Sequence, residues 1–403
     1  MEIRVPAPVE RIIGQLNEHG YEAYIVGGCV RDMLLGREPE DWDITTNALP
    51  EQVKAIFKRT IDTGIQHGTV TVMVDKTGYE VTTFRIDGEY RDGRHPSTVA
   101  FTPNLTEDLK RRDFTINAMA YNQTTGFVDE FGGVEDLKRG IVRCVGEPMD
   151  RFTEDALRIL RAIRFSAQLG FAIEERTYKA IRAIGPNLAK VSRERVQVEL
   201  TKLLLSGHPE RIAMVYETGI SEYVSETFHG LYGGSAEALP AVPERIPPKK
   251  YLRFAAFLRG GSPEQAVTVL KDLKMDNDTI NRVRTLIKRF PQRLAPEKPA
   301  LRRAMSQVGP ELFCDLLELK ECLLGVGTPE TGEEMAKIRE LWGEICRDKD
   351  CLSLRELAVT GRDVMDAGVK PGKAVGETLA ALLELVLEEP SRNTRDYLLQ
   401  HLK

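Results

Sequence analysis

Cysteine is scarce in this 403-residue sequence, and its positions match neither a metal site nor a disulfide framework. There is no CxxC pair, and no histidine cluster lies near the cysteines. Paired or clustered spacing would be expected of a zinc site or of a small disulfide-stabilised domain. We therefore expect free thiols at all six positions, which are Cys29, Cys144, Cys314, Cys322, Cys346 and Cys351.

Long apolar segments are also absent. No stretch approaches the roughly 18 consecutive apolar residues that a membrane helix needs, and the opening MEIRVPAPVE lacks the apolar core of a signal peptide. Gly and Pro are spread along the chain, and there is no internal repeat. The sequence predicts a cytoplasmic protein without a membrane partner, and its length favours two to four domains. The sequence does not indicate the oligomeric state.

Basic residues do not dominate the chain, since the net charge is −5. Residues 244–303 nevertheless hold 15 Lys or Arg against 6 Asp or Glu, whereas residues 311–345 hold 3 against 9. A basic segment in an acidic protein is typical of phosphate binding, but a solvated helical surface gives the same composition. Charge alone leaves both interpretations open.

Strand signals are confined to the first 150 residues. Apolar spacing predicts a helix over residues 9–16 that Gly20 would end, then strands at 21–26 and 41–45. Pro50 suits the start of a further helix, and GTVTVMV, the turn DKTG and YEVTTF (68–84) predict a hairpin. Later segments such as RFTEDALRILRAIRF (151–165) have helical periodicity. We predict an α+β fold, with a small mixed sheet followed by a long all-α part.

Two aspartates stand out on the strand predicted at 41–45. Asp41 and Asp43 are two residues apart, so on a strand their side chains would share one face. Two Mg²⁺ ions about 3.5 to 4 Å apart, held by carboxylate oxygens, can flank a phosphoryl group in an in-line displacement. Glu80, on the second strand of the hairpin, would join the pair if the strands are neighbours. The alternative is a solvent-facing acidic pair without function.

Gly27 and Gly28 lie between a predicted strand and a predicted short helix. Without a Cβ, backbone at this point can approach a triphosphate closely, although a purely structural turn explains the glycines equally. Arg31 and Asp32 follow within one helical turn, where a weak surface ion pair is the alternative to a phosphate contact.

Taken together, VGGCVRD (26–32), DWDI (41–44), the strand with Glu80 and RRDFTINAMA (111–120) resemble the transfer RNA nucleotidyltransferase and poly(A) polymerase family of the polymerase-β superfamily. The resemblance continues through residues 151–165 and 191–204. Within this family, the sequence resembles the bacterial class II CCA-adding enzymes. The resemblance covers the first half of the chain strongly and includes the helical stretch 354–387.

The resemblance implies a role for each matching residue. Asp41 and Asp43 would hold the catalytic Mg²⁺ ions with Glu80 in support. The residues that would contact the triphosphate and ribose of the nucleotide are Gly27, Gly28, Arg31, Arg112, Asp113 and Asn117. Asp155 and Arg158 match the family's protein template for the incoming base.

The chemistry of that template can be argued from the residues. Cytosine and adenine present an amine donor beside a ring-nitrogen acceptor, which the carboxylate of Asp155 and the guanidinium of Arg158 can pair with. Guanine and uracil present the opposite order. Three-residue spacing puts the two on one face of a helix, where an intrahelical ion pair is the alternative. Arg161 and Arg164 would be phosphate contacts or plain surface charge.

The implied function is addition of the 3′-terminal CCA to transfer RNA from CTP and ATP, without a nucleic-acid template. The 3′-hydroxyl of the RNA would attack the nucleotide α-phosphate in line at two metals and release pyrophosphate. Residues 87–99 match a loop that CC-only relatives shorten, which favours complete CCA addition or terminal A addition. The alternatives are an A-adding enzyme, a poly(A) polymerase, or an RNA-binding module without activity.

The implied architecture is a polymerase-β-like nucleotidyltransferase head followed by three helical parts. The head would span residues 1–145, the neck with the base template 146–205, the body 206–325 and the tail 326–403. The acceptor arm of transfer RNA would contact the helical parts, the tail in particular.

Overall fold

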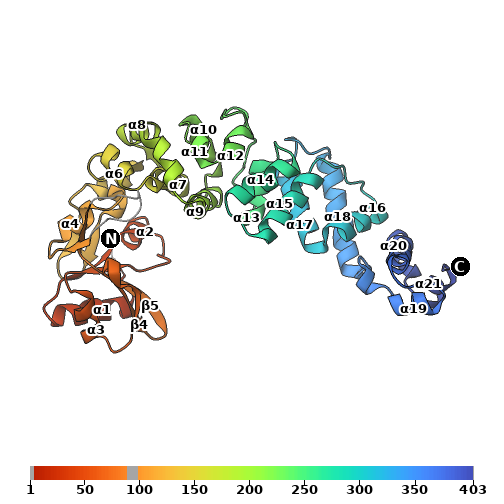
Figure 1. Ribbon diagram of the computed structural model, residues 1–403, viewed down its shortest axis with the longest axis horizontal. Helices are drawn as coiled ribbons and strands as arrows, with labels where there is room; N and C mark the ends of the chain where they lie inside the picture. The colour runs from red at the N-terminus through yellow and green to blue at the C-terminus, as the bar shows by residue number, and fades with distance from the viewer. Residues whose placement is uncertain (1–3, 89–98, 403) are drawn as a thin grey trace. The chain divides into compact units, whose positions relative to one another are not determined.

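The computed structural model describes residues 4–88 and 99–402, so most of the loop matched at 87–99 lies outside the described residues. Two compact units make up the chain. The first comprises residues 1–238 and 272–274, and the second comprises residues 239–271 and 275–403 (Figure 1). Within the described residues, no helix is both long enough and apolar enough to cross a membrane. All six cysteines are free, as expected.

A seven-stranded mixed sheet forms the N-terminal part of the first unit, with the strand order β3-β4-β5-β2-β1-β8-β9. The pair β2 and β5 is parallel, and the other neighbours in the sheet are antiparallel. The strands are β1 (Ala23–Val26), β2 (Ile44–Thr46), β3 (Thr60–Gly64), β4 (Thr69–Val74), β5 (Thr77–Thr83), β8 (Ala120–Asn122) and β9 (Gly126–Val128). The predicted mixed sheet is confirmed, but β3, β8 and β9 were not predicted.

The hairpin of β4 and β5 has the predicted turn. Val74 pairs with Thr77, and both residues between them have positive φ, 49° at Asp75 and 69° at Lys76. This two-residue turn matches the twist of the strands it connects. The hairpin thereby carries Glu80 on β5 into the middle of the sheet, next to β2.

Helices cover the sheet. They are α1 (Ala7–Glu18), α2 (Gly28–Leu34), α3 (Pro50–Ile56), α4 (Leu105–Lys110) and α5 (Gly133–Arg139). Figure 1 shows α1 and α3 together beside β4 and β5. Short elements complete this part, namely η1 (Ile65–His67), η2 (Thr115–Asn117) and the two-stranded sheet of β6 (Arg85–Asp87) and β7 (Val99–Phe101).

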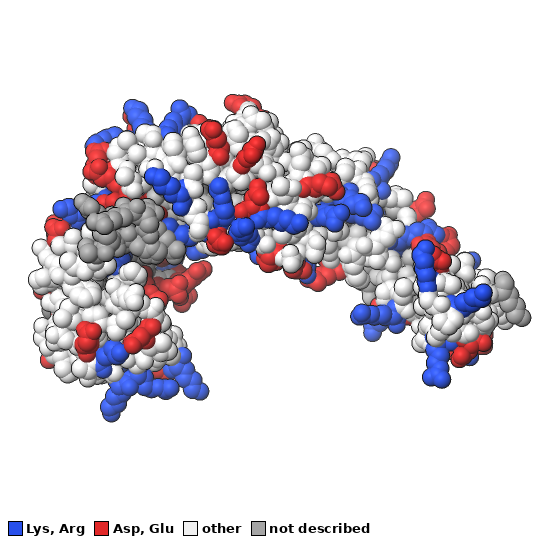
Figure 2. Space-filling view, in the orientation of Figure 1, with Lys and Arg blue, Asp and Glu red and all other residues white. Residues whose placement is uncertain are grey.

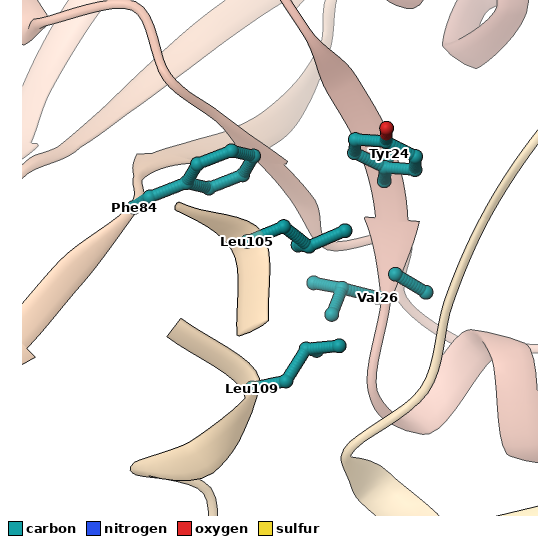
Figure 3. Close-up of a cluster of buried hydrophobic side chains, with 6 residues drawn as sticks. Tyr24, Val26, Phe84, Leu105 and Leu109 are labelled. Carbon is teal, nitrogen blue, oxygen red and sulfur yellow. The ribbon is translucent and has the colours of Figure 1, made fainter. Parts of the chain in front are cut away.

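An apolar cluster fixes α4 against the sheet (Figure 3). Leu105 and Leu109 of α4 pack with Tyr24 and Val26 of β1 and with Phe84, and all five are buried. Burying side chains of this size contributes about 1.5 to 3 kcal/mol each. Because α4 ends at Lys110, this cluster sets the position of the RRD sequence that follows it.

The rest of the first unit is helical, as predicted, apart from one short strand pair. Its helices are α6 (Pro148–Glu154), α7 (Leu157–Leu169), α8 (Glu175–Ile184), α9 (Arg193–Leu204), α10 (Ala213–Glu217), α11 (Ser221–Val224) and α12 (Glu226–Gly230), with η3 (Gly185–Lys190) and η4 (Pro209–Ile212). β11 (Ala172–Ile173) pairs in parallel with β10 (Ile141–Val142). The boundary between the two units, at residues 238/239, falls inside residues 206–325, which were predicted as the body.

The second unit has helices throughout its described residues. They are α13 (Lys250–Leu258), α14 (Pro263–Asp272), α15 (Asn277–Arg289), α16 (Lys298–Val308), α17 (Pro310–Cys322), α18 (Gly332–Asp348), α19 (Gly361–Asp366), α20 (Lys373–Glu388) and α21 (Arg395–Gln400), with η5 (Leu354–Glu356) and η6 (Pro390–Arg392). The predicted fold class, a mixed-sheet head followed by helices, is confirmed.

Candidate active site

The three predicted carboxylates lie on adjacent segments of the sheet. Asp41 and Asp43 come just before β2, and Glu80 lies on β5. The parallel register pairs Ile44 with Val81, so Asp43 and Glu80 each lie one position earlier on neighbouring segments. Burial raises the pKa of Glu80, and the charges of Asp43 and Asp41 raise it further. The three carboxylates therefore act on one another electrostatically.

The strand prediction for 41–45 was wrong at its start, because β2 begins at Ile44. The backbone of β1 turns away at Gly27, whose φ of 82° is outside the strand region, so Asp41 has no partner there. The carbonyl of Asp43 still accepts from the amide of Val26 at 3.0 Å. Asp43 is thus hydrogen-bonded to β1 one residue before β2 begins, and Asp41 lies two residues further from the strand.

The carboxylates fit a divalent cation. Burial raises the pKa of Asp43, the nearby Arg112 lowers it, and Asp41 raises it again. In the part of the chain that the structure describes, no group of three or more His, Cys, Asp or Glu side chains is placed to hold a metal ion. Mg²⁺ commonly takes only one or two carboxylates and completes its coordination with water and substrate phosphate. A pair of aspartates with a third carboxylate nearby matches that requirement.

Gly27 and Arg112 form one wall of the site. A Cβ added at Gly27 would lie 2.9 Å from Nη1 of Arg112 and would also be strained by the positive φ. Arg112 is anchored by the fully buried Asp108, with 3.6 Å between Nη2 and Oδ2. The Nε of Arg112 is buried and has no hydrogen-bond partner within residues 4–88 and 99–402. A cation with an unsatisfied donor beside bare backbone fits an anionic ligand.

A chain of hydrogen bonds runs from α2 to α7 through the RRD segment. Arg31 donates from Nη1 to Oδ1 of Asn117 at 2.7 Å, and Nδ2 of Asn117 donates to Asp113 at 3.1 Å. Arg161 donates to Asp113 through Nε at 2.8 Å. Burial alone would raise the pKa of Asp113, but Arg161 and Asn117 lower it to about 2. Arg31 also pairs with Asp32, and both side chains are largely buried, so this is no exposed surface pair.

Asp155 and Arg158, which the resemblance implies as template residues, do not share a helix face, and this corrects the prediction from their spacing. Asp155 lies in a break between α6 and α7 with extended backbone, whereas Arg158 lies on α7. Asp155 pairs with Arg195, and Arg158 pairs with Glu154. Arg158 donates to Glu154 at 2.5 Å and to the carbonyl of Arg111 at 3.1 Å. Arg158 is thus held at the junction of the RRD segment and α7.

Arg161 and Arg164 are not plain surface charges. Arg164 is 6% exposed, donates to Glu199 at 2.5 Å, and lies over the ring of Phe165 at 3.9 Å from its centroid. Arg161 and Arg31 approach the same ring at 5.4 and 5.2 Å. The ring of Phe165 therefore contacts Arg31 of α2 as well as Arg161 and Arg164 of α7. Cation–π attraction favours this arrangement.

Comparison with known proteins places the chain in a family. A family model described as poly A polymerase head domain matches residues 23–143, one described as RNA and SrmB-binding site of polymerase A matches 170–229, and one described as tRNA nucleotidyltransferase domain 2 matches 251–402. The CCA-adding enzyme of Enterococcus faecalis is 38% identical over an alignment of 407 positions that covers 100% of this chain and 96% of the relative. The chain belongs to the CCA-adding enzyme family. The CCA-adding enzyme of Geobacillus thermodenitrificans is 39% identical, covering 96% of this chain and 93% of the relative.

A solved CCA-adding enzyme has the same fold over its whole length. The crystal structure of the Bacillus stearothermophilus CCA-adding enzyme in complex with CTP superposes with a TM-score of 0.85 at 34% identity, covering 99% of this chain and 97% of that chain. The family assignment made from the motifs is confirmed.

Sequence reasoning missed three residues that hold the site together in this CCA-adding enzyme family member. Asp108 accepts from Nε and Nη2 of Arg111 at 2.9 and 2.8 Å and receives Thr45 Oγ1 at 3.3 Å. Its spacing of three and four residues from the arginines could have revealed it. Arg195 and Glu199 on α9 contact residues about 40 positions earlier. No local pattern predicts such distant pairs.

Proposed function

We propose that this chain adds the 3′-terminal CCA to transfer RNA, taking CTP and ATP as substrates and releasing pyrophosphate. The observation that carries the proposal is the meeting of Asp41, Asp43 and Glu80 beside Arg112 and Gly27. Family membership over the full chain agrees with it. The expected cytoplasmic location stays a prediction.

The carboxylates are the proposed holders of magnesium. Bound by Asp41 and Asp43, Mg²⁺ would lower the pKa of the attacking 3′-hydroxyl and offset the charge that develops on the α-phosphate. Glu80 adds negative charge at the same place. Arg112 and the backbone at Gly27 contact the triphosphate in this proposal, and Arg31, Asp113 and Asn117 hold the shape of the pocket around it.

Selection of the base is assigned to the neck. Asp155 accepts the exocyclic amine of cytosine or adenine, and Arg158 donates to the neighbouring ring nitrogen. Buried polar groups discriminate strongly, because a mismatched base leaves them unpaired. The fixed attachment of Arg158 to Glu154 and to the backbone supports this role, since a template must keep one orientation.

The RNA backbone is proposed to contact the second unit, but through fewer cations than composition indicates. Lys249 pairs with Asp315 at 2.6 Å, Lys250 pairs with Asp276 at 2.6 Å, and Arg253 is only 2% exposed. Arg253, which lies in the basic segment 244–303, is therefore not part of an exposed charged surface. Arg284 and Lys288, exposed on α15 and four residues apart, have no ion pair in the described ranges.

These two cations are therefore the proposed phosphate contacts of α15. Figure 2 shows Lys and Arg side chains along the part of the second unit that α13 and α15 form. When an exposed cation without an acidic partner neutralises a phosphate, the counterions condensed on the RNA at that phosphate are released.

The direct test of the proposal is loss of nucleotide addition in Asp41→Ala or Asp43→Ala. Each change removes a carboxylate from an exposed segment, so the fold should persist while incorporation of CTP into transfer RNA lacking its CCA end falls at least about 100-fold. Incorporation is measured as the increase in length of the labelled RNA on a denaturing gel, with circular dichroism as the control for folding. Retention of more than about a tenth of the wild-type rate by either folded variant would rule out the metal assignment.

A further inference from the structure

Asp155 depends on another helix for its orientation. It lies in the break between α6 and α7 with φ −142° and ψ 103°, and its Oδ1 accepts from the amide of Leu157 at 3.0 Å. Arg195 on α9 donates to both carboxylate oxygens, from Nη2 to Oδ2 at 2.7 Å and from Nη1 to Oδ1 at 3.3 Å. Only about a fifth of either side chain is exposed, at 22% for Arg195 and 15% for Asp155.

One carboxylate oxygen of Asp155 can accept a further hydrogen bond. Oδ1 already receives two donors, from Leu157 and from Arg195, whereas Oδ2 receives one from Arg195. A carboxylate oxygen can accept about two hydrogen bonds. Oδ2 is therefore the atom that can take a further amine donor, and the planar guanidinium of Arg195 fixes the direction in which it does so.

The same face of α9 holds two further residues of α7. Glu199, four positions after Arg195, accepts from Nε of Arg164 at 2.5 Å and lies 3.9 Å from Nη1 of Arg161. Residues four apart on a helix are neighbours on its surface. α9 packs along α7, and this face of α9 contacts Asp155 before α7 and two arginines on α7.

We propose that Arg195 is a positioning residue for base selection, which it serves by holding Oδ2 of Asp155 toward the exocyclic amine of the incoming base. This inference rests on the proposed function. Without Arg195 the carboxylate sits in a helix break with one backbone hydrogen bond, and it can rotate away from the base. Discrimination between cytosine and uracil should then fall, although no group that contacts the triphosphate has changed.

The test is a double-mutant cycle on base selectivity. The ratio of kcat/KM for CTP to that for UTP is measured on transfer RNA lacking its CCA end, for Arg195→Ala, Asp155→Ala and the double variant. We expect each single change to lower the ratio about tenfold, and the double variant to lower it no further, because both changes remove the same oriented acceptor. Arg195→Lys should recover part of the ratio, since lysine keeps the charge but not the paired donors.

Arg193→Ala is the matched control on the same helix. Arg193 donates to the carbonyl oxygens of Tyr223 and Val224, so its loss should lower stability and leave the ratio unchanged. Unchanged selectivity in Arg195→Ala together with relaxed selectivity in Asp155→Ala would overturn the role of Arg195 alone. Unchanged selectivity in Asp155→Ala would overturn the role of Arg195 together with the base-selection part of the proposed function. A fall in Arg193→Ala equal to that in Arg195→Ala would reduce Arg195 to a structural contact.

Discussion

At the scale of single residues, the second unit contains a fully buried ion pair. Lys320 on α17 and Glu330 are 0% exposed in their side chains, with 2.7 Å between Nζ and Oε1. Lys320 also donates to the carbonyl of Gln292 at 2.9 Å, and Glu330 accepts from the amide of Leu294 at 2.9 Å. Burial lowers the pKa of Lys320, and Glu330 opposes this shift. The pair connects α17 to the segment that follows α15.

Breaking this pair should destabilise the second unit strongly. Lys320→Met leaves Glu330 buried without its cation, and such a loss costs about 3 to 5 kcal/mol. Glu330→Gln, which leaves the ammonium uncompensated, should cost a similar amount. The double variant should cost clearly less than the sum of the two, because neither charge remains. The free energy of unfolding is measured by urea titration of the transition that includes this unit, and strict additivity would contradict a coupled pair.

Charge is the property that sequence predicted least well at this scale. Lys249, Arg253 and Arg164 all read as available cations, but each has an acidic or backbone partner and two of them are buried. The acidic partners of Lys249 and Arg164 lie 66 and 35 positions away in sequence, at Asp315 and Glu199. Only packing decides such pairs. The placement of Glu80 beside Asp41 and Asp43 was predictable, because the motifs are local and β2, which follows the aspartates, is the neighbour of β5.

At the scale of elements, the start of α5 sets the distance between that helix and η2. A Cβ added at Gly133, the first residue of α5, would lie 2.3 Å from the carbonyl oxygen of Thr115 in η2. That oxygen belongs to the backbone and cannot move alone. At Gly132 the space is open, although φ is +75°.

Gly133→Ala should therefore impair nucleotide binding, whereas Gly132→Ala should not. The first change moves α5 and η2 apart and displaces Asn117, which connects Arg31 to Asp113. The KM for CTP should rise about tenfold. Gly132→Ala costs about 1 to 2 kcal/mol of backbone strain and should leave KM unchanged. Steady-state kinetics on both variants checks this, and equal KM values would mean that the approach of α5 has no bearing on the site.

Elements with local signals were predicted well, and those that depend on distant partners were not. α1, the β4–β5 hairpin and α3 follow from periodicity, the turn sequence DKTG and Pro50, respectively. The segment 151–165 has continuous helical periodicity, yet it breaks at Asp155, where Arg195 binds the carboxylate. β8 and β9 have three residues each, and β8 pairs with β1 while β9 pairs with β8, so both depend on partners elsewhere in the sheet.

At the scale of the whole molecule, the proposed RNA contact on α15 gives a test in solution. Arg284→Glu with Lys288→Glu should weaken binding of transfer RNA and make it less sensitive to salt, by about 0.9 in the logarithmic slope per lost phosphate contact. Arg11→Glu with Lys54→Glu, on α1 and α3, changes the charge equally and serves as control, because both residues pair with aspartates and lie outside the segment matched to an RNA-binding family model. Filter binding between 50 and 200 mM salt, roughly the range over which such slopes are resolved, is the measurement. Identical slopes in the two double variants would place the RNA elsewhere.

Complete CCA addition is the central claim, and the sequence of the RNA product tests it most directly. Purified protein is incubated with Mg²⁺, all four nucleoside triphosphates and transfer RNA that ends at its discriminator base, and the 3′ ends are then sequenced. The account predicts that C, C and A are added in that order, that addition then stops, and that Asp41→Ala and Asp43→Ala add nothing. Addition of a lone A only to RNA already ending in CC, or of a continuing run of A, would contradict it in favour of an A-adding enzyme or a poly(A) polymerase.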